Sequence, residues 1–182
     1  ASGTVTFEGT GYTPVGDLEA GDGGLPEGKL ESELMRALAA GERASNARLE
    51  ETDRGWTVDG DPTEGALVVA ARKAALDEAA LDERYERVGE VAFSSERKRM
   101  STVYRDRGKE QQLVLFTKGA PDVLLELCNR ELVGDEMEEL TDERRKEITK
   151  TNERLAGDAL RTLGVAFRSL PAPEAARDGF DE

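Results

Sequence analysis

The hydrophobic and polar positions form strand-like patterns most densely in the middle of the chain, over residues 85–118. Three stretches there, YERVGEVAFS, RMSTVYRD and QQLVLFTKG, carry β-branched and aromatic residues in the pattern of strands. The polar stretch RDRGKE between the last two indicates a hairpin turn. Because strands joined by tight turns pair antiparallel, the pattern predicts an α+β fold. We expect an antiparallel sheet of about six or seven strands flanked by helices.

Shorter patterns complete the expected fold. TVTFEGTGYTPVGDLE indicates a strand or hairpin, GWTVDGDP a short strand and turn, and LRTLGVAFRSL a final apolar strand. Helices are expected over residues 30–40, 121–128 and 141–157, the last with Thr141 and Arg144 at its start. The clearest helix start has Asp61 as N-cap, Pro62 at the first helical position and Glu64 closing a capping box.

Length and composition favour a single domain over residues 1–182, with residues 171–182 as a frayed end or linker. The longest apolar run, ALVVAA at residues 66–71, is far shorter than the ~20 residues that span a bilayer. The N-terminus lacks the basic start and apolar core of a signal peptide. We therefore expect a soluble, intracellular, monomeric domain.

The chain contains one cysteine and no histidine, and its net charge is −14. One cysteine excludes an internal disulfide, and the absence of histidine argues against a zinc site, so we expect no metal ligands. The acidic excess argues against nucleic-acid partners, because few cations are available to displace counterions. A bound polyanion would need a local cluster of cations, and ERKRM at residues 96–100 is the densest candidate.

Four motifs could carry chemistry, and each also has a purely structural interpretation. GDPTEGAL (60–67) fits a capped helix start. FSSERKRMS (93–101) fits either a solvated strand edge or an aromatic platform beside cations, which suits a nucleotide. In KGAPDVLL (118–125), a lysine and a glycine precede a helix that begins with proline, a position that favours anions. LRTLGVAFR (160–168) places an arginine before an apolar strand, which alone indicates nothing.

Taken together, in this order and spacing, the four motifs closely resemble the nucleotide-binding (N) domain of P-type cation-transporting ATPases. The resemblance is nearest to the bacterial and archaeal calcium- or magnesium-pump branch. It covers nearly the whole chain, including the opening TFEGTGYTPVG, and it involves a domain of about this size. The chain has neither G-x-x-x-x-G-K-[ST] nor G-x-G-x-x-G, which excludes the common phosphate cradles.

The resemblance implies an ATP site, and four of its residues surround the adenine ring. Phe93 stacks on the ring, and Glu64 meets its edge. Lys118 lines the floor of the pocket, and Gly119 lets the ring approach the backbone.

Other residues of the same motifs face the phosphates. The resemblance assigns Lys98 and Arg161 to the phosphates, and Arg161 also helps to draw the domain toward its neighbour. Asp61 and Ser95 complete the expected nucleotide-binding set. No residue is expected to be catalytic.

The resemblance also implies what surrounds such a domain. ATP, as Mg-ATP in the parent pump, is presented to an aspartate of the phosphorylation domain, and the actuator domain is a further partner. The family's DKTGT and TGES loops are absent from this chain, so we expect it to bind ATP without hydrolysing it. In such pumps the transported ion is decided by membrane ligands, none of which is in this sequence; calcium is the first expectation, followed by magnesium and by sodium or potassium.

Two other function classes are open to test. An interaction module with this fold but without nucleotide binding is the main alternative, and the joint presence of Phe93, Glu64, Lys118 and Arg161 argues against it. A free-standing hydrolase lacks support, because the chain has no histidine and Cys128 has no evident activating partner.

Overall fold

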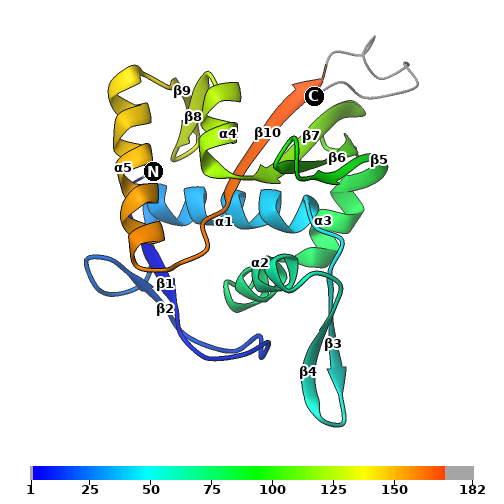
Figure 1. The fold of residues 1–182 in the computed structure, drawn as a ribbon. Coiled ribbons are helices and arrows are strands. Elements are labelled where there is room, and N and C mark those ends of the chain that lie inside the picture. Colours follow the sequence, from blue (N-terminus) through cyan, green and yellow to red (C-terminus); the bar gives the residue numbers. More distant parts are fainter. Residues whose placement is uncertain (1, 171–182) are drawn as a thin grey trace. The chain divides into compact units, whose positions relative to one another are not determined.

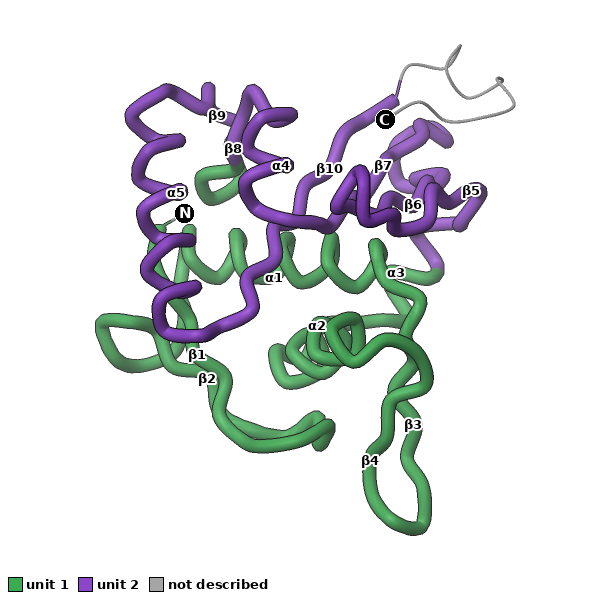
Figure 2. The backbone as a smooth tube through the Cα atoms, viewed as in Figure 1, with its two compact units in different colours: residues 1–82, 132–136 green, residues 83–131, 137–182 purple. Residues whose placement is uncertain are grey.

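The computed structural model describes residues 2–170. The contacts within the chain divide it into two units, shown in green and purple in Figure 2. Unit 1 comprises residues 1–82 and 132–136, and unit 2 comprises residues 83–131 and 137 onward. The residues 171–182, predicted to be a frayed end or linker, lie outside the described part.

Unit 1 contains two helices and two antiparallel strand pairs (Figure 1). β1 (Val5–Phe7) pairs with β2 (Leu18–Ala20), which confirms the expected N-terminal hairpin, and β3 (Arg48–Thr52) pairs with β4 (Gly55–Asp59). α1 (Gly28–Arg43) contacts α2 (Pro62–Lys73). The two helices contribute several apolar residues to the buried core, which are Leu38, Ala40, Val68, Val69 and Ala71.

The predicted start of α2 is confirmed. Asp61 is its N-cap, and its side chain accepts hydrogen bonds from the backbone N–H groups of Thr63 and Glu64 at 2.8 and 3.2 Å. Pro62 occupies the first helical position, where its missing N–H leaves no helical hydrogen bond unmade.

Unit 2 is built on a four-stranded antiparallel sheet with the order β10-β7-β6-β5. Its strands are β5 (Tyr85–Ser94), β6 (Arg99–Asp106), β7 (Gln112–Gly119) and β10 (Gly164–Leu170), and they lie side by side in Figure 1. The strand-rich patterns predicted the first three strands within a residue or two of their observed bounds. The antiparallel fold class is therefore confirmed, but the expected single sheet of six or seven strands is wrong: the described residues form ten strands, four in this sheet and six in three separate pairs.

The two faces of this sheet carry different cores, because successive side chains of a strand point to opposite faces. One face carries the buried aliphatic cluster Val103, Leu113, Leu115 and Leu170. On the other face Tyr85, Tyr104 and Phe116 make edge-to-face contacts, with ring centroids 5.3–6.2 Å apart. Both faces of the central strands β6 and β7 are therefore buried.

Two helices of unit 2 follow the sheet strands in the chain. α4 (Pro121–Leu127) begins with a proline, as expected, and α5 (Asp142–Gly157) is capped by Thr141, which accepts a hydrogen bond from the backbone N–H of Arg144 at 3.2 Å. The guanidinium of Arg145 donates to the carbonyl oxygens of Leu125 and Cys128, so it ties α5 to the end of α4.

Three short elements occur where the chain passes between the units. They are α3 (Glu78–Arg84) and the antiparallel pair β8 (Arg130–Val133) and β9 (Glu136–Glu139). Among residues 2–170, no helix has both the length and the hydrophobicity that crossing a bilayer requires.

Candidate functional site

Three of the four sequence motifs meet at one end of the unit 2 sheet. The strand register pairs Ser94 with Arg99, Arg99 with Gly119, and Gly119 with Gly164. The end of β5, the start of β6, the end of β7 and the start of β10 therefore lie in one row across the sheet. This row brings FSSERKRMS, KGAP and LRTLGVAFR together, and we call it the motif end of the sheet.

Phe93 stands at this end with its side chain outside the core. The register of β5 against β6 shifts between Val91 and Ser94, so that β5 has one residue more than its partner there. Such a bulge bends the strand and re-aims a side chain. Phe93 is 61% exposed, whereas Phe116 in the centre of the sheet is 6% exposed. A large aromatic ring held in solvent costs hydrophobic free energy, which makes it a candidate for binding.

The turn that follows Phe93 is fixed by its own hydrogen bonds. The backbone N–H of Lys98 donates to the carbonyl oxygen of Ser94 at 2.8 Å, and the N–H of Arg97 donates to the Ser94 hydroxyl at 3.1 Å. The guanidinium of Arg97 donates to the carbonyl oxygen of Ala92 at 2.5 Å. Lys98 has a left-handed backbone with φ of 52°, which closes the turn. Lys98 and Ser95 are both exposed.

The same turn contacts the KGAP joint. The N–H of Ala120 donates to the carbonyl oxygen of Lys98 at 3.0 Å. A Cβ atom built on Gly119 would lie 2.6 Å from that oxygen and 2.6 Å from the Cβ of Arg99. The absence of a side chain at Gly119 is thus required by the turn itself, which is a second reason for this glycine beside the expected approach of a ring.

Lys118 is buried, although lysine is rarely found inside proteins. Its Nζ lies 3.4 Å from the Sδ of Met100, the residue that pairs with it across the strands. Met100, itself 3% exposed, is a neighbour that sequence reasoning did not select. Only the strand register, set by residues far apart in the chain, could have indicated it.

Arg161 precedes β10 and is exposed, three residues before Gly164 in the motif-end row. Within unit 2, Arg161 therefore lies near the motif end of the sheet, as Phe93 and Lys98 do. Six of the eight predicted site residues belong to this group: Phe93, Ser95, Lys98, Lys118, Gly119 and Arg161.

The other two predicted residues, Asp61 and Glu64, belong to unit 1. Asp61 caps α2, as described above. One oxygen of Glu64 accepts hydrogen bonds from the backbone N–H groups of Asn46 and Ala47, at 2.6 and 3.0 Å. Glu64 thereby ties the start of α2 to the segment before β3, a structural role in addition to the expected one.

The opposite end of the sheet has a different electrostatic character. Asp106 is buried and receives two hydrogen bonds from Arg84, at 2.9 and 2.8 Å. The hydrogen bond from Arg84 holds the pKa of Asp106 below its usual value. This pair stabilises the sheet and lies far along the strands from the motif end.

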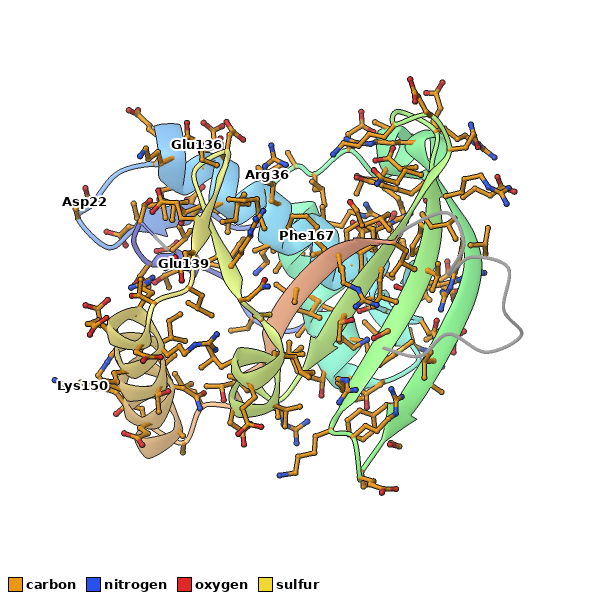
Figure 3. All side chains as sticks on the ribbon, turned by 90° about the horizontal axis from the view of Figure 1, so that it is seen from above. Asp22, Arg36, Glu136, Glu139, Lys150 and Phe167 are labelled. Carbon is orange, nitrogen blue, oxygen red and sulfur yellow. The ribbon has the colours of Figure 1, made fainter. Side chains whose placement is uncertain are left out.

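A cavity of 610 Å³ also lies in unit 2, beside β7, β10 and α4. Its described lining includes Thr117, Leu124 and Phe167, the last labelled in Figure 3. None of the eight predicted site residues lines it, although Arg99 of the motif-end row does. Among residues 2–170, no cluster of carboxylate and thiol groups suited to a metal ion was found.

Comparison with known proteins agrees with the sequence motifs. Residues 33–182 match the family described as "P-type ATPase, cytoplasmic domain N". A calcium-transporting ATPase of Bacillus subtilis is 32% identical over 171 residues, which are 94% of this chain and 19% of that protein. A probable cation-transporting ATPase F of Mycobacterium bovis is 33% identical over 181 residues, which are 99% of this chain and 19% of that protein.

A third relative is cation-transporting ATPase pma1 of Synechocystis, 32% identical over 178 residues, with 95% of this chain and 19% of that protein covered. The chain thus spans about a fifth of the length of these relatives. The family description agrees with the expected cytoplasmic position of the domain. The chain belongs to the family of the cytoplasmic N domain of P-type cation-transporting ATPases.

Proposed function

We propose that this domain binds ATP at the motif end of the unit 2 sheet and, in a longer parent pump, presents it to an aspartate of a neighbouring domain. The observation that carries the proposal is the exposed ring of Phe93, held at the sheet end where Lys98, Lys118 and Gly119 also lie. An aromatic face beside cations suits a purine that carries phosphates. The family of the chain supports the same conclusion.

Each residue has a role that its surroundings allow. The Phe93 ring stacks on adenine, and the buried Lys118 lies beneath it next to Met100. The exposed cations Lys98 and Arg161 meet the phosphates, with Ser95 beside them in the turn. By the family resemblance alone, Glu64 meets the adenine edge and Asp61 belongs to the nucleotide-binding set.

The isolated chain binds ATP without hydrolysing it. In the family, the acceptor is an aspartate in a DKTGT loop, which this sequence lacks. Burial raises the pKa of the Cys128 thiol, which keeps it in its less nucleophilic protonated form. Incubation of the purified chain with Mg-ATP is expected to release no phosphate above background, and steady release that persists through repurification would contradict this expectation.

The parent pump moves a cation, and calcium is the first expectation because the Bacillus subtilis relative is named a calcium-transporting ATPase. The remaining partners are the phosphorylation and actuator domains of that pump. Reading the membrane segments of the full-length parent sequence would test the choice of ion.

The variant Phe93→Ala tests the ATP site. Loss of a stacking ring costs about five- to a hundredfold in affinity, and because the ring is 61% exposed, its removal is expected to change the melting temperature little. Adenosine is the sharper ligand, because it has no phosphates for Lys98 or Arg161 to hold. A folded variant that binds ATP and adenosine like wild type would favour the interaction module without nucleotide binding.

A further inference from the structure

We propose that Arg97 is a positioning residue for the adenine platform: its guanidinium holds the bulge that turns Phe93 out of the core. This inference rests on the proposed function of Phe93. The sequence suggested Arg97 only as one of three consecutive cations, whereas its contacts point to a geometric role.

The bulge is the first step of the argument. Val91 pairs with Ser101 and Ser94 pairs with Arg99, so Ala92 and Phe93 together face the single residue Met100. A bulge of this kind disrupts the ladder and leaves backbone groups to be satisfied in another way. The exposure of Phe93 depends on this extra residue. Without it, the register would change by one residue, and the side chains that follow would point to the opposite face of the sheet.

Arg97, in the turn after the bulge, provides these hydrogen-bond partners. Its Nη2 donates to the carbonyl oxygen of Ala92 at 2.5 Å, and its backbone N–H donates to the hydroxyl of Ser94 at 3.1 Å. One residue thus binds the chain on both sides of Phe93. Arg97 is half-buried, whereas the neighbouring Lys98 is exposed. Arg97 therefore serves the protein's own backbone, and Lys98 is the cation of this turn that a ligand can reach.

Arginine suits this role better than lysine. Its planar guanidinium presents several donors in a fixed arrangement, and the same Nη2 lies 3.5 Å from the carbonyl oxygen of Arg99 across the turn. A lysine at this position offers a single flexible ammonium group. We therefore expect Arg97→Lys to restore part, and not all, of what Arg97→Ala loses.

The test measures adenosine and ATP affinity of the full 182-residue chain by calorimetry, with melting temperatures alongside. Arg97→Ala is expected to weaken adenosine binding roughly three- to tenfold, the equivalent of one net hydrogen bond, and Arg97→Lys less. Arg107→Ala is the matched control, because Arg107 also donates to a backbone carbonyl, that of Glu83, at the other end of the sheet. It is expected to leave adenosine affinity unchanged.

A double-mutant cycle shows whether Arg97 acts through Phe93. In a Phe93→Ala background, Arg97→Ala is expected to cause no further loss of adenosine affinity, because the platform is already gone. Additive losses, or a folded Arg97→Ala that binds adenosine like wild type while Phe93→Ala does not, would overturn this inference and leave the proposed function intact. If Phe93→Ala itself binds normally, the proposed function fails and this inference fails with it. Should Arg97→Ala not fold, the same comparisons are made with Arg97→Lys.

Discussion

The two hairpin turns of the unit 2 sheet have similar compositions and opposite uses of charge. The turn between β5 and β6 contains Arg97 and Lys98, and the turn between β6 and β7 contains Arg107 and Lys109. At the second turn, two arginines are paired with acids: Arg84 of α3 binds Asp106, and Arg107 of the turn lies 3.4 Å from Glu86. In the first turn, Arg97 donates to the backbone carbonyl of Ala92 and Lys98 extends from an exposed position.

This difference would allow an acidic chain to hold the proposed site for an anion. Ion pairs neutralise Arg84 and Arg107 at the end of the sheet opposite the motif end, which we call the structural end, so these two add little to the attraction of a nucleotide. At the motif end, Lys98 is exposed near the exposed ring of Phe93, where the proposed site would use it for phosphate. The basic residues of a turn can therefore be assigned to a binding site or to a structural role only when their partners in the structure are known.

The largest expected effect concerns the structural end. Asp106→Ala removes a buried carboxylate and leaves Arg84 without its two hydrogen bonds. Breaking a buried pair costs ~3–5 kcal/mol; because the Arg84 side chain is 45% exposed, we expect about 2–3 kcal/mol in chemical unfolding. ATP affinity measured on the folded variant is expected to stay at the wild-type value. A loss of ATP binding without unfolding would show that the two ends are coupled.

The next effect concerns the contact between the first turn and the KGAP joint. Gly119→Ala places a Cβ 2.6 Å from both the Lys98 carbonyl oxygen and the Arg99 Cβ, so the turn must move. Overpacking of this kind costs about 1–3 kcal/mol, and adenosine binding is expected to weaken with stability. Gly157→Ala is the control, since a Cβ there meets nothing within 4 Å. Equal melting temperatures for Gly119→Ala and wild type would disprove the close approach.

A smaller effect distinguishes the two lysines of the turns. Lys98→Ala is expected to weaken ATP binding about two- to fivefold, the worth of an exposed ion contact of up to ~1 kcal/mol, and adenosine binding less. Lys109→Ala removes the same charge from the other turn and is expected to change neither affinity. Calorimetric titrations of both variants decide the point, and equal losses of ATP affinity would mean that the net charge of the domain, and no local site, governs binding.

The smallest expected effect is a pH response of the structural end. The hydrogen bond from Arg84 lowers the native pKa of Asp106 below its ordinary value of 3.8. A carboxyl with a lowered native pKa contributes stability that is fully present above its unfolded pKa and is lost as the pH falls through the native pKa. The difference in unfolding free energy between wild type and Asp106→Asn is expected to become smaller below about pH 4. A gap that stays constant down to pH 2 would contradict the assignment.

Much of the fold could be predicted from local patterns. The strands β5, β6 and β7 are marked by β-branched and aromatic residues, and Asp61 and Thr141 mark helix starts through side chains a few residues from the groups they cap. The strands and the short helix that the patterns missed are β3, β8, β9 and α3. β3 reads RLEET and β9 reads EMEE, mostly exposed, and α3 has no buried residue, so no hydrophobic period marks them.

The sequence by itself determined the order of the motifs, the residue types they contain and the family to which they belong. Only the tertiary structure decided how these residues are used: the bulge that exposes Phe93, the contact of Lys98 with the joint at Gly119, the burial of Lys118 beside Met100, and the binding of Arg97 to the Ala92 carbonyl. Capping and alternation act over a few neighbouring residues and can be read locally. Register and burial depend on strands brought together from residues 93 to 164, and that pairing is set by the packing of the whole sheet.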